Sequence, residues 1–173
     1  MKRTALVAGA ALLFITITYG LTSAQTVEVE LLNAQGEKVG SGTLVQQPAG
    51  VRISLQVRNL TPGPHGFHIH AIGKCDPPDF TSAGGHFNPE GKKHGLKNPA
   101  GPHAGDLPNI VVKPDGTAVA DVVASTITFG PGNHSLSGPQ GTALVIHANP
   151  DDELTDPAGG AGPRIACGVI GPR

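Results

Sequence analysis

Apolar and polar residues alternate along several short stretches of this chain. Over residues 51–58 every odd position is apolar and every even position is Arg, Ser or Gln. A period of two is typical of a β-strand that buries one face. We predict strands, some alternating and some continuously apolar, over residues 26–32, 51–57, 67–71, 110–113, 117–123, 143–147 and 165–170.

The segments between the predicted strands are rich in turn-forming residues. The 173-residue chain has 25 Gly and 16 Pro, and Pro114-Asp115-Gly116 divides two of the predicted strands. Proline and glycine supply the backbone conformations that tight turns need. No stretch shows a convincing helical period. The pattern therefore predicts an all-β domain, an antiparallel sandwich or barrel of about eight short strands.

Two segments are too long to be simple turns. Residues 73–109 and 149–162 are rich in Gly and Pro, and the first contains Cys75 and three of the eight histidines. Loops beyond about 12–15 residues in a compact domain are usually functional or disordered. We therefore expect two long functional loops, the first of them held in place by a metal and a disulfide.

The first residues have the organisation of a secretory signal peptide. Lys2 and Arg3 precede an apolar stretch over residues 5–17, and small residues at 22–24 form a cleavage site before Gln25. We predict a signal peptide over residues 1–24 and one mature domain over residues 25–173, periplasmic or secreted. An uncleaved anchor is the alternative, but the apolar stretch is short for a membrane span of about 20 residues. After cleavage we expect no stable membrane insertion.

The charges and the cysteines narrow the picture further. Lys+Arg (12) and Asp+Glu (13) nearly balance, for a net charge of −1. This balance argues against a nucleic-acid binder built on a basic patch. The two cysteines, Cys75 and Cys167, indicate one disulfide in an exported chain. Two free buried thiols are the alternative.

Six histidines and one aspartate are spaced as metal ligands. His68 and His70 lie two apart on a predicted strand, so both side chains leave the same face. The first long loop adds His86, His94, His103 and Asp106, and a late strand adds His147. Three imidazoles and one carboxylate make a closed tetrahedral set that suits zinc, and neutral imidazole also suits copper. Any one of these residues alone could be a surface or hydrogen-bonding group, as we expect for His65 in the core, but together they indicate a metal site.

Several longer motifs resemble those of copper/zinc superoxide dismutases. They are Gly66-Phe67-His68-Ile69-His70, Gly84-Gly85-His86-Phe87-Asn88-Pro89, His94-Gly95, His103-Ala104-Gly105-Asp106-Leu107-Pro108-Asn109 and Arg164-Ile165-Ala166-Cys167-Gly168-Val169-Ile170-Gly171. The likeness covers nearly all of residues 25–173, in order. It implies a Greek-key β-sandwich. It also implies an enzyme that converts superoxide, its small-molecule substrate, to dioxygen and hydrogen peroxide, with copper and zinc as cofactors.

The resemblance also implies roles for individual residues. The implied copper ligands are His68, His70, His86 and His147. The implied zinc ligands are His86, His94, His103 and Asp106, so that His86 bridges the two metals and carries a proton during catalysis. Asp151 would hydrogen-bond one ligand of each metal. Arg164 would attract the anion beside the copper, and Cys75–Cys167 would be the family disulfide.

Some alternatives stay open at this point. A related module that only handles copper or holds a structural metal would explain the ligands without catalysis. An adhesion module of the immunoglobulin type would not explain six histidines at these spacings. With a negative net charge, attraction of an anionic substrate needs a local positive patch, and Lys74, Lys92 and Lys93 are the nearest candidates along the chain. The oligomeric state is not fixed by the resemblance, and a homodimer is one option.

Overall fold

The computed structural model describes residues 24–171, so the predicted signal peptide, apart from Ala24, lies outside the described residues. The described chain forms nine β-strands and one short 3-10 helix. They are β1 (Thr26–Asn33), β2 (Lys38–Gln47), β3 (Gly50–Val57), β4 (Gly63–His65), β5 (Phe67–His70), η1 (Thr81–Ala83), β6 (Ile110–Val112), β7 (Ala118–Ala124), β8 (Thr142–His147) and β9 (Arg164–Ile170).

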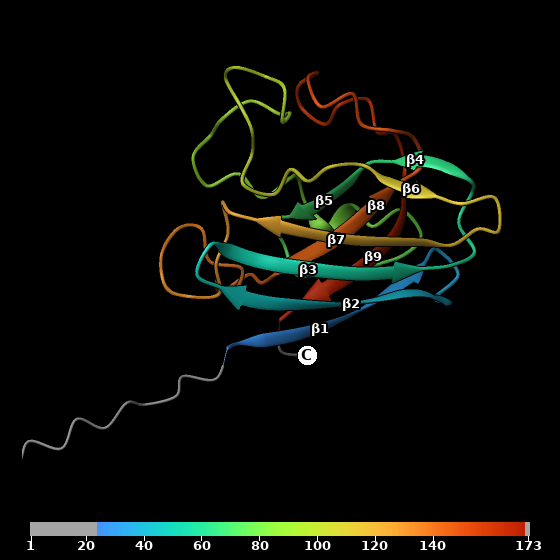
Figure 1. Ribbon diagram of the computed structural model, residues 1–173, viewed down its shortest axis with the longest axis horizontal. Coiled ribbons are helices and arrows are strands. Elements are labelled where there is room, and N and C mark those ends of the chain that lie inside the picture. Colours follow the sequence, from blue (N-terminus) through green and yellow to red (C-terminus); the bar gives the residue numbers. More distant parts are fainter. Residues whose placement is uncertain (1–23, 172–173) are drawn as a thin grey trace, which may run out of the picture.

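Seven of these strands form one curled sheet (Figure 1). Their order is β5-β8-β9-β1-β2-β3-β7, and β4 pairs with β6 in a second, small sheet. Every pairing is antiparallel. Because β5 lies beside β8, and β9 beside β1, long connections join strands that are distant in sequence, as in Greek-key folds. The all-β, antiparallel prediction is confirmed.

The alternation pattern did not reveal β2, although this strand has 10 residues. Two of its buried positions are Gly40 and Gly42, which hide the apolar period. A Cβ on Gly40 would lie 2.8 Å from both Gln56 O and Val57 Cγ1. Side chains from the neighbouring strands therefore fill the space that a larger residue on β2 would need. Strand β4 also escaped prediction, because its three residues begin with Gly63, a turn-forming residue.

A hydrophobic core fills the inside of the curled sheet. Its largest fully buried side chains include Leu31, Ile53, Phe67, Leu144 and Ile146. Full burial of such a side chain stabilises the fold by about 1.5–3 kcal/mol relative to exposure. Since Phe67 belongs to this core, the core also determines which face of β5 carries the two histidines.

The first long loop is attached to the sheet by a small apolar cluster and by the disulfide. Phe80 and Ala83 of the loop pack with Val145 and Cys167 of the sheet. Cys75 is disulfide-bonded to Cys167, which lies 92 residues away in sequence. The predicted disulfide is confirmed. A link across so long a loop contributes about 4–5 kcal/mol in the chain-entropy model.

Within residues 24–171 there is no helix with the length and apolar character needed to cross a membrane.

Candidate metal centre

Strand β5 directs two histidines toward the long loops. Phe67 and Ile69 pack into the core. Successive side chains of a strand point to opposite faces, so His68 and His70 emerge on the other side. Both histidines are buried, 0% and 1% exposed. The fold thus forces two imidazoles into the interface between the sheet and the loops.

Three backbone hydrogen bonds form a closed ring that joins the first loop to β5. Ile69 N donates to Gly105 O (2.9 Å), Gly105 N to Phe87 O (2.9 Å), and Phe87 N to Ile69 O (2.8 Å). A Cβ at position 105 would lie 2.3 Å from Ile69 O, so this close approach requires glycine. The bridges that flank the ring pair candidate ligands, His68 with Asp106 and His70 with His86.

Four imidazoles meet in a first cluster, with one nitrogen of each lying within 4.8 Å of the others. They belong to His68, His70, His86 and His147. His70 Nδ1 donates to Gly84 O (2.9 Å) and His147 Nδ1 donates to Gly162 O (2.9 Å). Because a carbonyl oxygen only accepts, each of these rings carries its hydrogen on Nδ1 and keeps a lone pair on Nε2. The two Nε2 atoms face each other at 3.4 Å.

The remaining two nitrogens of the first cluster are unsatisfied. His68 Nδ1 and His86 Nε2 are buried and have no hydrogen-bond partner among the described residues. A buried polar atom without a partner costs about 1–3 kcal/mol. A cation that prefers imidazole ligands would satisfy these two atoms and both facing Nε2 atoms at once. The donor set therefore fits a copper ion.

The second cluster combines three imidazoles with a carboxylate. Asp106 Oδ1 lies 2.9 Å from His86 Nδ1, 3.1 Å from His94 Nδ1 and 3.3 Å from His103 Nδ1. Ligands at the corners of a zinc tetrahedron lie about 3.3 Å apart, given zinc–nitrogen bonds of about 2.0 Å. The other oxygen of Asp106 accepts the backbone N–H groups of Gly95 (2.8 Å) and His103 (2.9 Å). The set fits zinc in both composition and spacing, and His86 belongs to both clusters.

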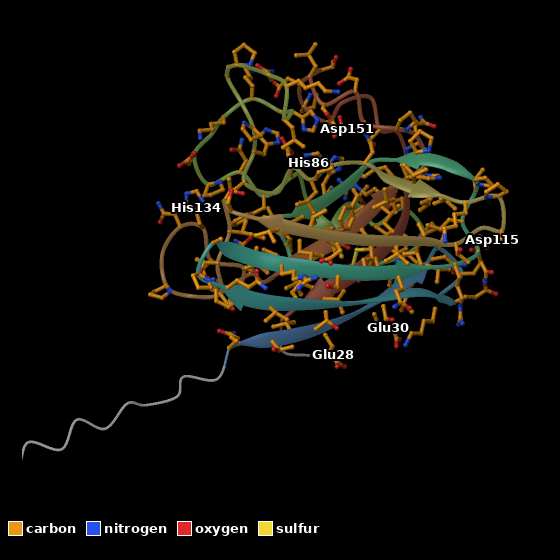
Figure 2. All side chains as sticks on the ribbon, in the orientation of Figure 1. Glu28, Glu30, His86, Asp115, His134 and Asp151 are labelled. Atoms are coloured by element: carbon orange, nitrogen blue, oxygen red, sulfur yellow. A yellow bond between two sulfur atoms is a disulfide. The ribbon has the colours of Figure 1, made fainter. Side chains whose placement is uncertain are left out.

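Asp151 joins the two clusters from the second long loop. Its Oδ2 accepts from His68 Nε2 (2.7 Å) and its Oδ1 from His94 Nε2 (3.0 Å). Asn109 holds this aspartate in place with two 2.8 Å hydrogen bonds, from its Nδ2 to Asp151 O and from Asp151 N to its Oδ1. Sequence reasoning missed the role of Asn109, for which the only signal is its place at the end of the His103–Asn109 motif. Figure 2 labels His86 and Asp151 in the part of the molecule where the two long loops lie over the sheet.

The buried histidines of the first cluster favour their neutral form. Burial lowers the pKa of His68 to about 4, against the opposing hydrogen bond with Asp151. Burial also lowers the pKa of His147 to about 4, and the charges of His86 and Arg164 add to this effect. Neutral imidazole is the form that binds metal ions. His68 and His147 therefore stay neutral, and able to bind a cation, well below neutral pH.

The second cluster holds charge of both signs. Burial opposes the protonated form of His94, but its hydrogen bonds with Asp106 and Asp151 outweigh burial and raise its pKa to about 9. Burial likewise opposes the charged form of Asp106, yet hydrogen bonds from His86, His94 and the Gly95 amide keep its pKa far below the usual range. The carboxylate thus stays ionised and available to a cation.

Arg164 lies at the start of β9, close to the first cluster. Its guanidinium donates to Phe80 O and, at 2.6 Å, to Gly84 O. Gly84 O also accepts from His70 Nδ1, so Arg164 and His70 share one carbonyl. The geometry fixes a positive charge beside the imidazoles without an ion pair in the described chain.

Other candidates from the sequence lie apart from the clusters. His65 is buried and contacts two backbone carbonyls, Thr61 O (2.7 Å) and His147 O (2.8 Å), which matches its predicted role as a hydrogen-bonding core residue. Lys92 is paired with Glu90 (2.6 Å) and Lys93 with Asp156 (2.9 Å). Their charges are therefore compensated locally.

Comparison with known proteins places this architecture among characterised relatives. The family model described as "Copper/zinc superoxide dismutase (SODC)" matches residues 39–170. Superoxide dismutase [Cu-Zn] 1 of Aquifex aeolicus is 49% identical over 162 residues, covering 92% of this chain and 96% of the relative. The Cu/Zn superoxide dismutase of Brucella abortus superposes with a TM-score of 0.71 at 31% identity, over 85% of this chain and 100% of that one. A SOD-like protein from Bacillus subtilis superposes with a TM-score of 0.80 at 40% identity, over 83% and 97%.

Proposed function

Because this chain belongs to the copper/zinc superoxide dismutase family, we propose that it converts superoxide into dioxygen and hydrogen peroxide. The observation that carries the proposal is the pair of buried, unpartnered nitrogens, His68 Nδ1 and His86 Nε2, where four imidazoles meet. The proposed copper ligands are His68, His70, His86 and His147. The proposed zinc ligands are His86, His94, His103 and Asp106.

Bound copper supplies one-electron redox chemistry, oxidising one superoxide to dioxygen and reducing a second to the level of peroxide. The reduction of the second superoxide also needs protons, and residues of the chain can hold and deliver one of them. His86 Nε2 faces the first cluster and its Nδ1 faces Asp106 at 2.9 Å. When Nε2 is not a ligand, it is the nitrogen that can hold a proton and pass it to the product. Solvent supplies the other proton of hydrogen peroxide.

The proposed zinc set has a structural task, since zinc carries no redox chemistry. Bound zinc would be held in part by His86, whose Nδ1 faces Asp106, and Nε2 would then keep its direction toward the first cluster. His94, His103 and Asp106 would hold the same ion, and together they would stabilise a loop that has no regular secondary structure over these positions. The protein can then keep the shared imidazole in one orientation through a catalytic cycle.

Arg164 is the proposed anion-binding group. Its two hydrogen bonds to backbone carbonyls hold the guanidinium in one place. An arginine stays protonated at any working pH and presents a rigid fork of donors. A small anion such as superoxide would find there the local positive charge that the net charge of −1 does not provide.

We propose export for the same chain, with removal of residues 1–24. The support is the sequence pattern at the N-terminus and the disulfide Cys75–Cys167, which persists in oxidising compartments. N-terminal sequencing of the protein secreted or released from the periplasm would read Gln25 first. The homodimer remains a prediction, which sedimentation of the mature protein would test.

The decisive experiment measures superoxide decay with mature protein loaded with both metals. Zinc-only protein and the His147→Ala variant are the controls, since His147 belongs to the copper set alone. We expect fast decay that requires both copper and His147. If the loaded protein binds one copper and one zinc yet clears superoxide no faster than buffer, the copper-handling alternative replaces the enzyme.

A further inference from the structure

The second long loop holds His94 at two separate points. Asp151 accepts the Nε2–H of His94 (3.0 Å). Farther along the same loop, Asp156 Oδ1 accepts the backbone N–H of His94 at 2.8 Å. Because His94 Nδ1 faces Asp106 at 3.1 Å, the backbone amide and both ring nitrogens of this histidine are engaged. Two of these three contacts come from a loop that provides no zinc ligand.

The two oxygens of Asp156 make contacts of different strength. Oδ2 pairs with Lys93 Nζ at 2.9 Å, but these side chains are 37% and 60% exposed. Exposed ion pairs contribute little to stability. The contact of Oδ1 with the His94 amide is a charge-assisted hydrogen bond to a buried residue, which belongs to the stronger class. The backbone contact therefore carries the argument.

Further contacts hold the two loops together next to this hydrogen bond. Lys97 N donates to Glu153 O (2.9 Å), and Lys97 Nζ pairs with the Glu153 carboxylate (2.9 Å). A Cβ on Gly95 would lie 2.3 Å from Glu153 O, so the backbones are in close contact immediately after His94. Figure 1 shows the two loops next to each other beyond β5 and β8.

We infer that Asp156 is a positioning residue for the zinc site, acting through its hydrogen bond to the backbone of His94. The inference rests on the proposed zinc set. Removal of the acceptor frees the main chain of His94 while leaving every proposed ligand in place. Zinc retention then depends on the docking of a loop that itself contributes no ligand to zinc.

The test measures zinc release from the fully loaded mature protein to an excess of chelator, together with hydrogen exchange at the His94 amide. Removal of such a supporting partner typically costs about 10–100-fold in metal affinity. We expect Asp156→Ala to release zinc about 10–100-fold faster and to expose the His94 amide to exchange. Asp156→Asn keeps an acceptor oxygen, so it should release zinc within about threefold of the wild-type rate.

Two matched variants separate the hydrogen bond from the ion pairs. Lys93→Gln removes only the partner of Asp156 Oδ2, and Lys97→Gln removes the other ion pair between the same loops. Both should retain zinc nearly as the wild type does. Wild-type zinc retention in Asp156→Ala, or release from Asp156→Asn as fast as from Asp156→Ala, would overturn the inference. If Asp156→Ala does not fold, zinc release that is tenfold faster than wild type from Asp156→Asn or Lys93→Gln would likewise overturn the inference. Failure of the wild type to bind zinc at all would instead contradict the proposed function.

Discussion

Asp151 Oδ2 lies 2.7 Å from Nε2 of His68, and this contact decides which nitrogen of the ring faces the first cluster. With its hydrogen on Nε2, His68 keeps the Nδ1 lone pair for a cation. The same carboxylate bonds His94 in the second cluster. One side chain that is no proposed ligand therefore orients one imidazole in each of the two clusters.

We expect Asp151→Ala to weaken the binding of both metals, by about 10–100-fold each. The substitution leaves Nε2 of His68 and of His94 without an acceptor, so both rings lose their fixed orientation. Competition with chelators, run separately for copper and zinc, measures the effect. Asp152→Ala is the control, because Asp152 caps only the backbone of its own loop. Wild-type affinity for both metals in Asp151→Ala would contradict the orienting role.

The backbone ring at Ile69, Phe87 and Gly105 predicts an unusually sensitive glycine. In Gly105→Ala the new methyl group would meet Ile69 O at 2.3 Å, so strand and loop must separate. Overpacking of this kind costs about 1–3 kcal/mol. Denaturant unfolding of the disulfide-intact protein should show that loss. Gly85→Ala, in the same loop with open space around its Cβ position, should change the unfolding free energy by less than about 0.5 kcal/mol.

Sequence reasoning predicted most of the strands, the candidate ligands and the contacts of Asp151 with them, but not the backbone contacts that hold these residues in place. The alternation in β3 is visible because its inward residues are large and its outward residues polar. In β2 the same geometry is hidden, because Gly40 and Gly42 face the core and carry no apolar side chain. Periodicity reports side-chain chemistry, so it misses a strand whose inward positions are partly glycine, even though Val39 and Leu44 of β2 belong to the core.

The same limit applies to the candidate site. Histidine spacing and the resemblance predicted all the candidate ligands, because the residue types that bind metals can be read directly from the sequence. Three of the contacts that were not predicted depend on backbone groups. They are the hydrogen-bonded ring through Gly105, the hydrogen bond between Asn109 and the Asp151 amide, and the hydrogen bond of Asp156 with the His94 amide. Backbone groups are the same in every residue, so only the fold shows which of them meet.

The metal-free protein should lose stability in acid through its buried histidines. Unfolded histidines have a pKa near 6.5, whereas burial lowers the pKa of His68 and of His147 to about 4 in the folded chain. The pKa of His70 is lowered further, also by burial. Between about pH 6.5 and pH 4 the unfolded chain binds protons that the folded chain does not. As the pH is lowered through this range, the unfolding free energy should therefore fall by about 1.4 kcal/mol per pH unit for each such histidine.

The pKa of His94 is shifted in the opposite direction, so His94 affects stability in a different pH range. Its pKa is raised to about 9, so below pH 6.5 it is protonated in both states and leaves the acid slope unchanged. Its contribution is instead lost as the pH rises through 9. Urea unfolding of metal-free protein between pH 4 and pH 9 would measure both trends. A flat profile from pH 6.5 to pH 4 would contradict the neutral form of the first-cluster histidines.

Arg164 should dominate the attraction of substrate, because it lies beside the first cluster and two of the three candidate lysines are compensated by ion pairs. Lys92 is paired with Glu90 and Lys93 with Asp156, whereas the guanidinium of Arg164 donates to two carbonyl oxygens and makes no salt bridge within residues 24–171. Focused charge raises association rates by about 10–1,000-fold. We therefore expect Arg164→Gln to lower kcat/KM for superoxide about tenfold or more.

Ionic strength separates this effect from a general disturbance of the site. The kcat/KM of the wild type should fall as salt rises, since screening weakens a local positive charge. Arg164→Gln should show a lower rate and a flatter salt dependence at unchanged copper and zinc content. Lys92→Gln should keep the wild-type salt dependence and a rate within about twofold of it. If Lys92→Gln were the variant that flattened the salt dependence, the pairing with Glu90 would not neutralise its charge, and steering would lie in the loop rather than at β9.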